Sequence, residues 1–429
     1  MRTPATWGRS TTERAAHAPV SSFKFPVSRY NVFVPVTSNR LLREFCPPDY
    51  SGGSIVNLLA SVIRSRGGRA PHADLKGLPA RDLKGARKVV YLVIDGLGQQ
   101  QLDRYLASRP RKFFFSEHAH RTITTVFPAT TAAAITTFST GASPAEHGIL
   151  GWHLHLPDLG MVSTILPATT RTGSPMAGEK FDLRKYLKLP LPLESVKCRK
   201  ELISWGDIPE GRFTRAGVRW NRKRSCTTLA GLSRQIEAFA KAPGRALAYA
   251  YWPGYDSLCH EVGCAHPRTV RQLAAIDRTL AGLVRKLRGT GTALIVTADH
   301  GLVDSAPAHR ISFREIPGFY DCLAVLPSGD ARCAHCFVRP SKVRKFRRIF
   351  FQCLEKSCAC VPGGELLRLG AFGPGKPHPA LVNRVGDYVL IAKSDYCFSS
   401  HLPGEKIEFN VANHGGMSAA EVRVPLVVV

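Results

Sequence analysis

The stretch VVYLVIDG, residues 89–96, decides the fold class of this 429-residue chain. It is an unbroken apolar and largely β-branched run from Val89 to Ile94 that ends in an acid and a glycine. Such a run is typical of a strand that is buried on both faces, as in a parallel sheet. Two later segments repeat the pattern with polar residues at or just after the carboxyl end: ALAYAYW (residues 246–252) and TALIVTADHG (residues 292–301).

A helix is predicted between those two later strands. Residues 269–287, TVRQLAAIDRTLAGLVRKL, have apolar side chains at helical spacing and few helix breakers. Strand, helix and strand at this spacing predict an α/β fold with a doubly wound, mainly parallel sheet and helices on both faces. Because ligands of such sheets bind outside the carboxyl ends of the strands, we expect the functional residues there.

The amino-acid composition of the chain changes after residue 304. This stretch is rich in cysteine, contains the basic run RPSKVRKFRR, and ends in the strand-like DYVLIAK before the chain returns to an apolar strand in NHGGMSAAEVRVPLVVV. An inserted cap subdomain fits this order. The predicted organisation is a flexible basic tail over residues 1–30, the first part of the catalytic core over 31–304, the smaller cap over 305–400 and the return of the core over 401–429.

The chain is strongly basic, with 59 Lys and Arg against 32 Asp and Glu and a formal net charge of +27. A field of this sign attracts anionic substrates, and it also occurs on proteins that bind nucleic acids or membrane surfaces. The basic residues are spread along the chain, and no nucleic-acid-binding signature accompanies them. Solvated basic faces are therefore favoured, and a nucleic-acid partner is not expected. No apolar run of about 18 residues occurs, which argues against a membrane span.

Twelve cysteines occur without the apolar core of a secretory signal, which predicts reduced thiols in a cytoplasmic protein. Cys333 and Cys336 have the spacing of one zinc knuckle, whereas the later pair, Cys358 and Cys360, is too closely spaced for a second. Free thiols are therefore favoured over a structural zinc site. The oligomeric state is left open.

Seven residues in short strand-end motifs carry the predicted chemistry. Six are Asp or His, the types that hold two zinc-like ions, and one is a hydroxyl; two cations can clamp the attacking and leaving oxygens of a phosphoryl transfer. They are Asp95, Thr131, Asp256, His260, Asp299, His300 and His414.

Each of these residues alone also has a structural interpretation. Asp95 could cap a helix, and Thr131 could cap the small-residue helix AAAITTFSTG, with Thr130 competing for either role. Asp256 and His260 are four apart, a spacing that places both side chains on one face of a helix. The adjacent Asp and His of TADHG at a strand end are harder to explain structurally. The combination predicts a metal-dependent hydrolase.

The motifs together resemble the alkaline phosphatase superfamily, and within it the type I phosphodiesterase/nucleotide pyrophosphatase family. The stretches that carry the resemblance are VIDGLG, FPATTAAAITTFSTGASPAEHGILGW, the Asp256–His260 pair, TADHG and NHGGMSAAEVRVPLVVV. The resemblance implies two divalent ions, usually zinc. It implies that Asp95, Asp299 and His300 hold one ion, and that Asp256, His260 and His414 hold the other.

The resemblance also implies a nucleophile that bridges the two ions. In the family this residue lies nine positions before the Thr of an (S/V)TG turn, which is Ser139-Thr140-Gly141 here, so Thr131 is preferred to Thr130. Attack by Thr131 on phosphorus would form a phosphothreonine intermediate. The implied substrate is a small anionic phosphate ester with a phosphodiester or pyrophosphate bond, and nucleotides fit this class.

Two alternatives remain open at this point. Diesterase members usually carry an Asn soon after Phe-Pro or elsewhere in the site, whereas this chain has Ala129 after Phe-Pro, so a phosphomonoesterase or phosphonate hydrolase could use the same core. A non-catalytic binding protein could also retain the fold. All seven expected positions hold competent residues, which favours an enzyme.

Overall fold

The structure is a computed structural model that describes residues 44–108, 113–176, 182–400 and 409–429. The described residues belong to one compact unit, Val36–Val429. The basic tail predicted over residues 1–30 lies outside the described residues.

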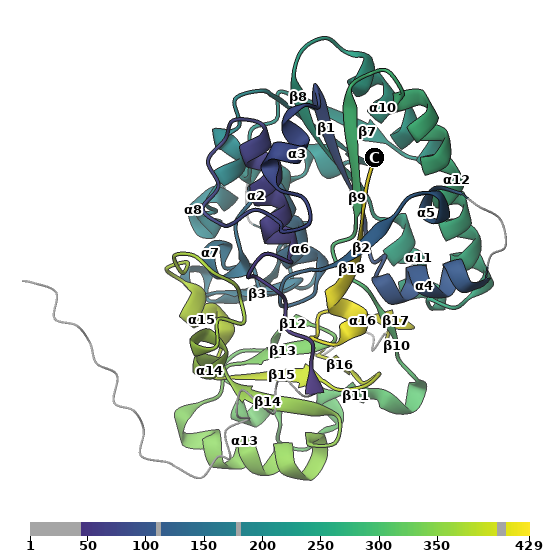
Figure 1. The fold of residues 1–429 in the computed structure, drawn as a ribbon. Helices are drawn as coiled ribbons and strands as arrows, with labels where there is room; N and C mark the ends of the chain where they lie inside the picture. The colour runs from purple at the N-terminus through teal and green to yellow at the C-terminus, as the bar shows by residue number, and fades with distance from the viewer. Residues whose placement is uncertain (1–43, 109–112, 177–181, 401–408) are drawn as a thin grey trace, which may run out of the picture. The chain divides into compact units, whose positions relative to one another are not determined.

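A seven-stranded sheet, in the order β2-β18-β9-β1-β8-β6-β7, forms the main layer (Figure 1). Strands β9, β1, β8, β6 and β7 run parallel, whereas β18 is antiparallel to both β9 and β2. The predicted α/β fold with a mainly parallel sheet is confirmed. The bounds are β1 Lys88–Ile94, β2 His120–Thr124, β6 Arg199–Trp205, β7 Arg222–Cys226, β8 Ala246–Trp252, β9 Thr292–Thr297 and β18 Arg423–Val428.

Helices cover both faces of this sheet, and the alternating side chains of β1 show why its sequence is apolar from Val89 to Ile94. The Tyr91 hydroxyl donates to the Phe138 carbonyl of α6 at 3.1 Å, so Tyr91 faces α6. Leu92 and Ile94 point to the opposite face, where they meet side chains of α10 and α12. A strand with helices on both sides has no face for polar residues.

Several of the described helices begin or end at conventional capping residues. Helix α6 follows Thr130 and ends at Gly141, which has a left-handed φ of 83°. Helix α12 starts at Pro267, after the capping side chain of His266. The α-helix bounds are α2 Ile55–Ser65, α3 Ala80–Lys84, α4 Gln99–Ser108, α5 Phe114–Glu117, α6 Thr131–Thr140, α7 Pro144–His147, α8 Leu183–Leu187, α9 Arg212–Ala216, α10 Leu229–Lys241, α11 Gly254–Val262, α12 Pro267–Leu287, α13 Val343–Ile349, α14 Gly363–Arg368, α15 Leu381–Val385 and α16 Ala419–Val422.

A second seven-stranded sheet has the order β14-β15-β13-β12-β3-β4-β5 and its own apolar cluster. It joins β3–β5, from residues 153–170, to β12–β15, from residues 328–392, through the pairing of His153 with Gly329. The domain bounds at residues 304 and 400 stay a prediction. The strands are β3 His153–Leu156, β4 Met161–Thr164, β5 Thr169–Thr170, β12 Ser328–Asp330, β13 Cys333–Cys336, β14 Cys358–Pro362 and β15 Tyr388–Ala392.

Two short strand pairs lie beside the sheets: β10 (Val303–Asp304) with β17 (Ala412–Asn413), and β11 (Arg310–Ser312) with β16 (Cys397–Ser399). All twelve cysteines are free thiols. In the described part of the chain, no helix combines the length and apolarity needed to cross a bilayer.

Candidate active site

The topology of the main sheet brings the predicted strand-end residues together. Strands β8, β1 and β9 are parallel neighbours, so their carboxyl ends meet at one edge. Asp95 follows β1, Asp256 lies on α11 just after β8, and the pair Asp299-His300 follows β9. Gly96, between the strand ends, has a positive φ of 73°, and a Cβ on it would lie 3.0 Å from the Asp256 Cβ. A glycine is required for this close approach.

Three other elements supply the remaining residues. Thr131 is the first residue of α6, His260 lies one turn after Asp256 on α11, and His414 follows β17. The structure therefore gathers all seven predicted residues in one region. Asp95, Thr131, Asp256, His260 and His414 line the pocket, whereas the side chains of Asp299 and His300 are fully buried behind it.

One group able to hold a metal ion consists of Asp95, Asp299 and His300, whose ligand atoms lie within 4.8 Å of one another. The His300 Nε2 atom is 3.4 Å from Asp95 Oδ1 and 3.5 Å from Asp299 Oδ2. The Thr131 hydroxyl lies 2.9 Å from the same His300 nitrogen. This group contains the three residues expected for the first ion, with Thr131 beside it.

A second such group contains Asp256, His300 and His414, again within 4.8 Å. His260, which was expected here, places its Nε2 atom 3.2 Å from Asp256 Oδ2, while its Nδ1 atom contacts the Ala412 carbonyl at 2.7 Å. The His414 Nε2 atom is 3.9 Å from Asp256 Oδ1, and the rings of His300 and His414 stack with centroids 3.8 Å apart. Asp256 is therefore flanked by His260 and His414, and His300 lies between the two groups.

The electrostatics of this region favour bound cations. Among the described residues, four buried atoms at the centre lack a hydrogen-bond partner: Asp95 Oδ1, Asp256 Oδ1, Asp299 Oδ2 and His414 Nδ1. Burying several carboxylates together is costly unless a positive charge compensates. Carboxylate oxygens and imidazole nitrogens are the ligands that zinc-type ions prefer. The residues present therefore fit bound metal ions of this kind.

The pKa values of these groups reflect the burial of several ionisable side chains close together. Burial, and then the charges of Asp299 and Asp256, raise the pKa of Asp95 well above its usual value. Burial also raises the pKa of Asp299. Although burial opposes the change, His260 holds the pKa of Asp256 below its usual value. Burial and the neighbouring His300 lower the pKa of His414, which therefore stays neutral and able to coordinate.

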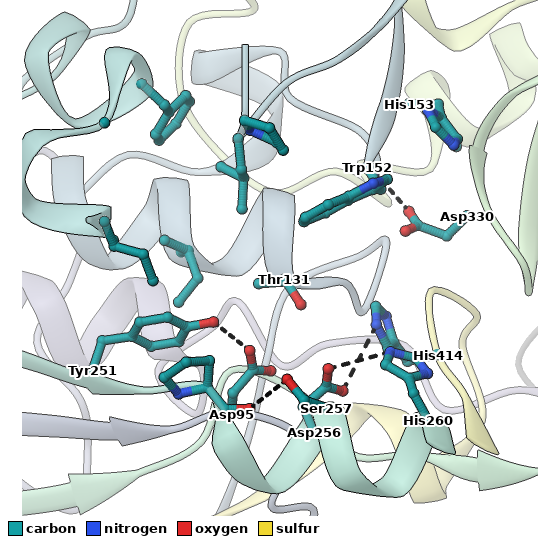
Figure 2. Close-up of a pocket in the computed structure, with 18 of the residues that line it drawn as sticks. Asp95, Thr131, Trp152, His153, Tyr251, Asp256, Ser257, His260, Asp330 and His414 are labelled. Carbon is teal, nitrogen blue, oxygen red and sulfur yellow. Dashed lines mark hydrogen bonds and ion pairs between the residues drawn. The ribbon is translucent and has the colours of Figure 1, made fainter. Parts of the chain in front are cut away.

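The structure adds residues that the sequence did not single out. They line a pocket of about 910 Å³ around Thr131. The Tyr251 hydroxyl donates to Asp95 Oδ2, and Trp152 extends over the pocket on the side of Thr131 away from Asp256 and His414 (Figure 2). Tyr249 and Tyr251 alternate in ALAYAYW, so strand periodicity could have placed both on the face of the site.

Asp330, at the end of β12, is an acid in the pocket that sequence reasoning missed. Its Oδ1 atom accepts the Thr130 hydroxyl at 2.9 Å and its Oδ2 atom accepts the Trp152 backbone N–H at 3.2 Å. Burial raises the pKa of Asp330 to about 6. Sequence reasoning missed Asp330 because no local motif surrounds it. It reaches the pocket only through the strand pairing of the second sheet.

The chain matches one protein family and has a fold similar to several solved structures. Residues 89–416, about three quarters of the chain, match the family described as type I phosphodiesterase / nucleotide pyrophosphatase. Murine ectonucleotide pyrophosphatase/phosphodiesterase 5 has a similar fold, with a TM-score of 0.60 at 18% identity over 79% of this chain and 87% of that chain. An inactive Thr-to-Ala variant of that protein has been solved in complex with AMP, with a TM-score of 0.59 at 18% identity over 79% of this chain and 87% of that one.

Phosphonoacetate hydrolase from Sinorhizobium meliloti 1021, in complex with phosphonoformate, is a third neighbour. Its TM-score is 0.59 at 17% identity, over 80% of this chain and 90% of that chain. At these identities the likeness shows the fold. No curated protein matches the sequence significantly.

Proposed function

The chain belongs to the type I phosphodiesterase/nucleotide pyrophosphatase family, and from this premise we propose that it hydrolyses phosphodiester or pyrophosphate bonds with Thr131 as nucleophile. It is a phosphoric ester hydrolase of a metal-dependent family. Its expected ligands are the three Asp and three His residues of the site. Two ions of the zinc type would be held, one by Asp95, Asp299 and His300 and the other by Asp256, His260 and His414.

The single observation that carries the proposal is the convergence of unpartnered buried ligand atoms beside one hydroxyl. Four carboxylate or imidazole atoms lack hydrogen-bond partners among the described residues, and the Thr131 hydroxyl lies 2.9 Å from His300 at the junction of the two ligand groups. A fold that only buried these residues would leave their desolvation uncompensated. This argues for bound metal ions, and the Thr131 hydroxyl beside the ligand groups favours an enzyme over a non-catalytic binding protein.

Chain residues would position each part of the reaction. When bound, the ions would lower the pKa of the Thr131 hydroxyl and offset charge on the phosphoryl oxygens. The start of α6 points free backbone N–H groups and the positive end of its dipole toward an anion bound at Thr131. Attack by the Thr131 oxygen on phosphorus would break the bond to the leaving oxygen, which takes up a proton. Water would then attack the phosphothreonine and restore the hydroxyl.

The neighbours support small anionic phosphorus compounds as substrates. The inactive murine variant, in which a threonine is replaced, binds AMP, so a nucleotide-type diester or pyrophosphate is the leading substrate. A phosphonate hydrolase on the same core is the second candidate, because phosphonoacetate hydrolase shares the fold over 90% of its length.

The test is hydrolysis by the zinc-loaded full-length chain of bis(p-nitrophenyl) phosphate, p-nitrophenyl phosphate and phosphonoacetate. We expect diester turnover that falls at least about 1,000-fold in Thr131→Ala and is partly retained in Thr131→Ser, because only serine keeps the nucleophilic oxygen. Thr290→Ala is the matched control, since Thr290 precedes β9 at the opposite end of the strand from the site. Full diester activity in Thr131→Ala would exclude this nucleophile, and turnover of phosphonoacetate alone would favour the second candidate.

A further inference from the structure

The basic run RPSKVRKFRR forms one helical segment together with the residues that follow it. Helix α13 (Val343–Ile349) continues directly into a π-helical segment, Phe350–Leu354. From residue 342 to residue 356 the chain carries six Lys or Arg residues and a single acid, Glu355. None of these residues lines the pocket around Thr131, so the proposed reaction does not account for them.

This segment covers the outer face of the second sheet. Tyr388 of β15 stacks on Phe346 of α13, with ring centroids 5.3 Å apart. The next residues of β15 in alternation, Val389 and Ile391, belong to an apolar cluster that includes Ala132 of α6. Because successive side chains of a strand point to opposite faces, α13 lies on the side of this sheet that faces away from α6 (Figure 1).

Helical spacing divides the segment into a buried side and an exposed side. The buried side is apolar and consists of Phe346, Ile349, Phe350 and Leu354. Side chains three or four residues apart share one face of a helix, so Arg344, Arg348 and Phe351 lie together on the other side. All three are exposed, Phe351 to 52%. We call Arg344, Arg348 and Phe351 the basic face; the half-buried Lys345 and Arg347 flank it.

Neighbouring acids compensate this charge only in part. Lys345 pairs with Asp321 at 3.1 Å, but both side chains are exposed, and ion pairs of this kind are weak. Glu355 ends the segment, and Asp387 precedes the tyrosine that stacks on α13. Even if all three acids are counted against the six basic residues of the segment, an excess of three positive charges remains.

The form of the basic face decides between anionic partners. A basic helix can enter the groove of an acidic protein when its apolar side is free, whereas here that side is buried against the sheet. Single-stranded nucleic acids typically bind in basic grooves with several aromatic platforms, whereas this face is the outside of one helix with one exposed ring. A surface of anionic lipids needs only clustered Lys and Arg, and an exposed Phe can enter it.

We propose that the basic face docks the protein on the surface of anionic lipid membranes. Arg344 and Arg348 contact the lipid head groups, and the Phe351 ring enters the boundary between head groups and acyl chains. The inference is independent of the proposed function, because no residue of the pocket takes part in the docking. Membrane binding is therefore measured without turnover.

Docking is measured by sedimentation of the full-length chain with vesicles of phosphatidylcholine, alone or with about 30% phosphatidylserine, at about 0.15 M salt. We expect binding to the anionic vesicles only. Arg344→Gln/Arg348→Gln should weaken it roughly 30-fold, since each basic side chain near such a surface contributes about fivefold. Phe351→Ser should weaken it about fivefold, because half of a Phe side chain no longer leaves water.

The matched control is Arg81→Gln/Lys84→Gln, which removes the same charge from exposed positions on α3. If the net charge of +27 alone drove binding, the two double variants would lose affinity equally, and that result would overturn the inference. Binding to single-stranded RNA and to duplex DNA is measured at the same salt. A larger loss of affinity for either nucleic acid than for vesicles in Arg344→Gln/Arg348→Gln would also overturn it.

The orientation of the docked protein is tested with Phe351→Trp and anionic vesicles that contain brominated phosphatidylcholine, which quenches tryptophan emission on contact. We expect stronger quenching in this variant than in the parent chain. Val382→Trp is the control, because Val382 is 68% exposed on α15, whose Leu381 and Val385 pack in the inner apolar cluster of the second sheet. Equal quenching of the two introduced tryptophans would contradict docking through the basic face.

Discussion

Tyr251 is not a predicted ligand, yet its hydroxyl donates to Asp95 Oδ2 and orients that carboxylate. Residues that orient metal-binding side chains typically affect affinity almost as much as the ligands do. We predict that Tyr251→Phe weakens zinc binding about 10- to 100-fold, measured by competition with a chromophoric chelator. Tyr320→Phe is a suitable control, since Tyr320 lies outside the pocket. Unchanged affinity in Tyr251→Phe would show that Asp95 needs no such support.

Asp330 should make stability depend on pH. Burial raises its pKa from 3.8 to about 6. A group whose folded pKa is raised contributes stability that is present in full below the unfolded pKa and is lost as pH rises through the folded pKa. We therefore predict that metal-free Asp330→Asn gains thermal stability relative to the parent chain between about pH 4 and pH 7, with little further gain above. Calorimetry across this range tests the prediction, and a difference that does not vary with pH would contradict it.

The contrast between Asp330 and the predicted residues has a physical basis. Asp95, Asp299 and His300 sit directly after apolar strands, and the carboxyl ends of neighbouring parallel strands always meet, so local sequence places them together. Asp330 follows no such run, and its approach to Thr130 depends on how the second sheet pairs. The identity of the histidine that binds the same ion as Asp256 depends on side-chain geometry, which sequence spacing alone does not determine.

At the scale of elements, a buried ion pair ties the second sheet to the loop that carries His414. The Arg332 Nε atom donates to Glu421 Oε1 at 2.9 Å, and both side chains are fully buried. The same Glu421 oxygen accepts the Gly416 N–H at 2.7 Å, two residues after His414. The Arg332–Glu421 ion pair therefore helps to position His414, a proposed metal ligand, from a residue of the second sheet.

We predict that Arg332→Met destabilises the protein by about 3–5 kcal/mol, because Glu421 is left as an uncompensated buried charge. Urea unfolding of the two proteins measures the loss. Replacing Arg368, which pairs with Glu365 at the surface, should have little effect. Equal losses in the two variants would mean that burial of the Arg332 pair is unimportant.

Strands and helices were predictable where a local sequence pattern determines them. The strands β1, β8 and β9 and the helix α12 were expected from apolar runs and helical spacing, and the structure confirms them within a few residues. The second sheet joins residues 153–170 to residues 328–392. No periodicity in the sequence predicts that strands some 170 residues apart pair with each other. The cap bounds therefore stay a prediction.

At the scale of the whole molecule, the charge of the site opposes the charge of the chain. The net charge is +27, yet the pocket around Thr131 is lined by four Asp side chains: Asp95, Asp207, Asp256 and Asp330. A basic exterior attracts anions, whereas the acids inside require cations before an anion can bind. The cytoplasmic location and the absence of a nucleic-acid partner stay predictions.

Metal loading should consequently stabilise the entire fold. Asp95, Asp256 and Asp299 come from the ends or immediate surroundings of three central strands, so relief of their repulsion acts on the main sheet itself. A ligand that binds only the folded state adds about 2.7 kcal/mol per site when its free concentration is 100-fold above Kd. We predict a higher Tm with zinc than with a chelator. In Asp95→Asn/Asp299→Asn the metal-free Tm should rise and the response to zinc should shrink, since one ligand group and its repulsion are removed together. A zinc response of unchanged size in that double variant would place the stabilising ion elsewhere.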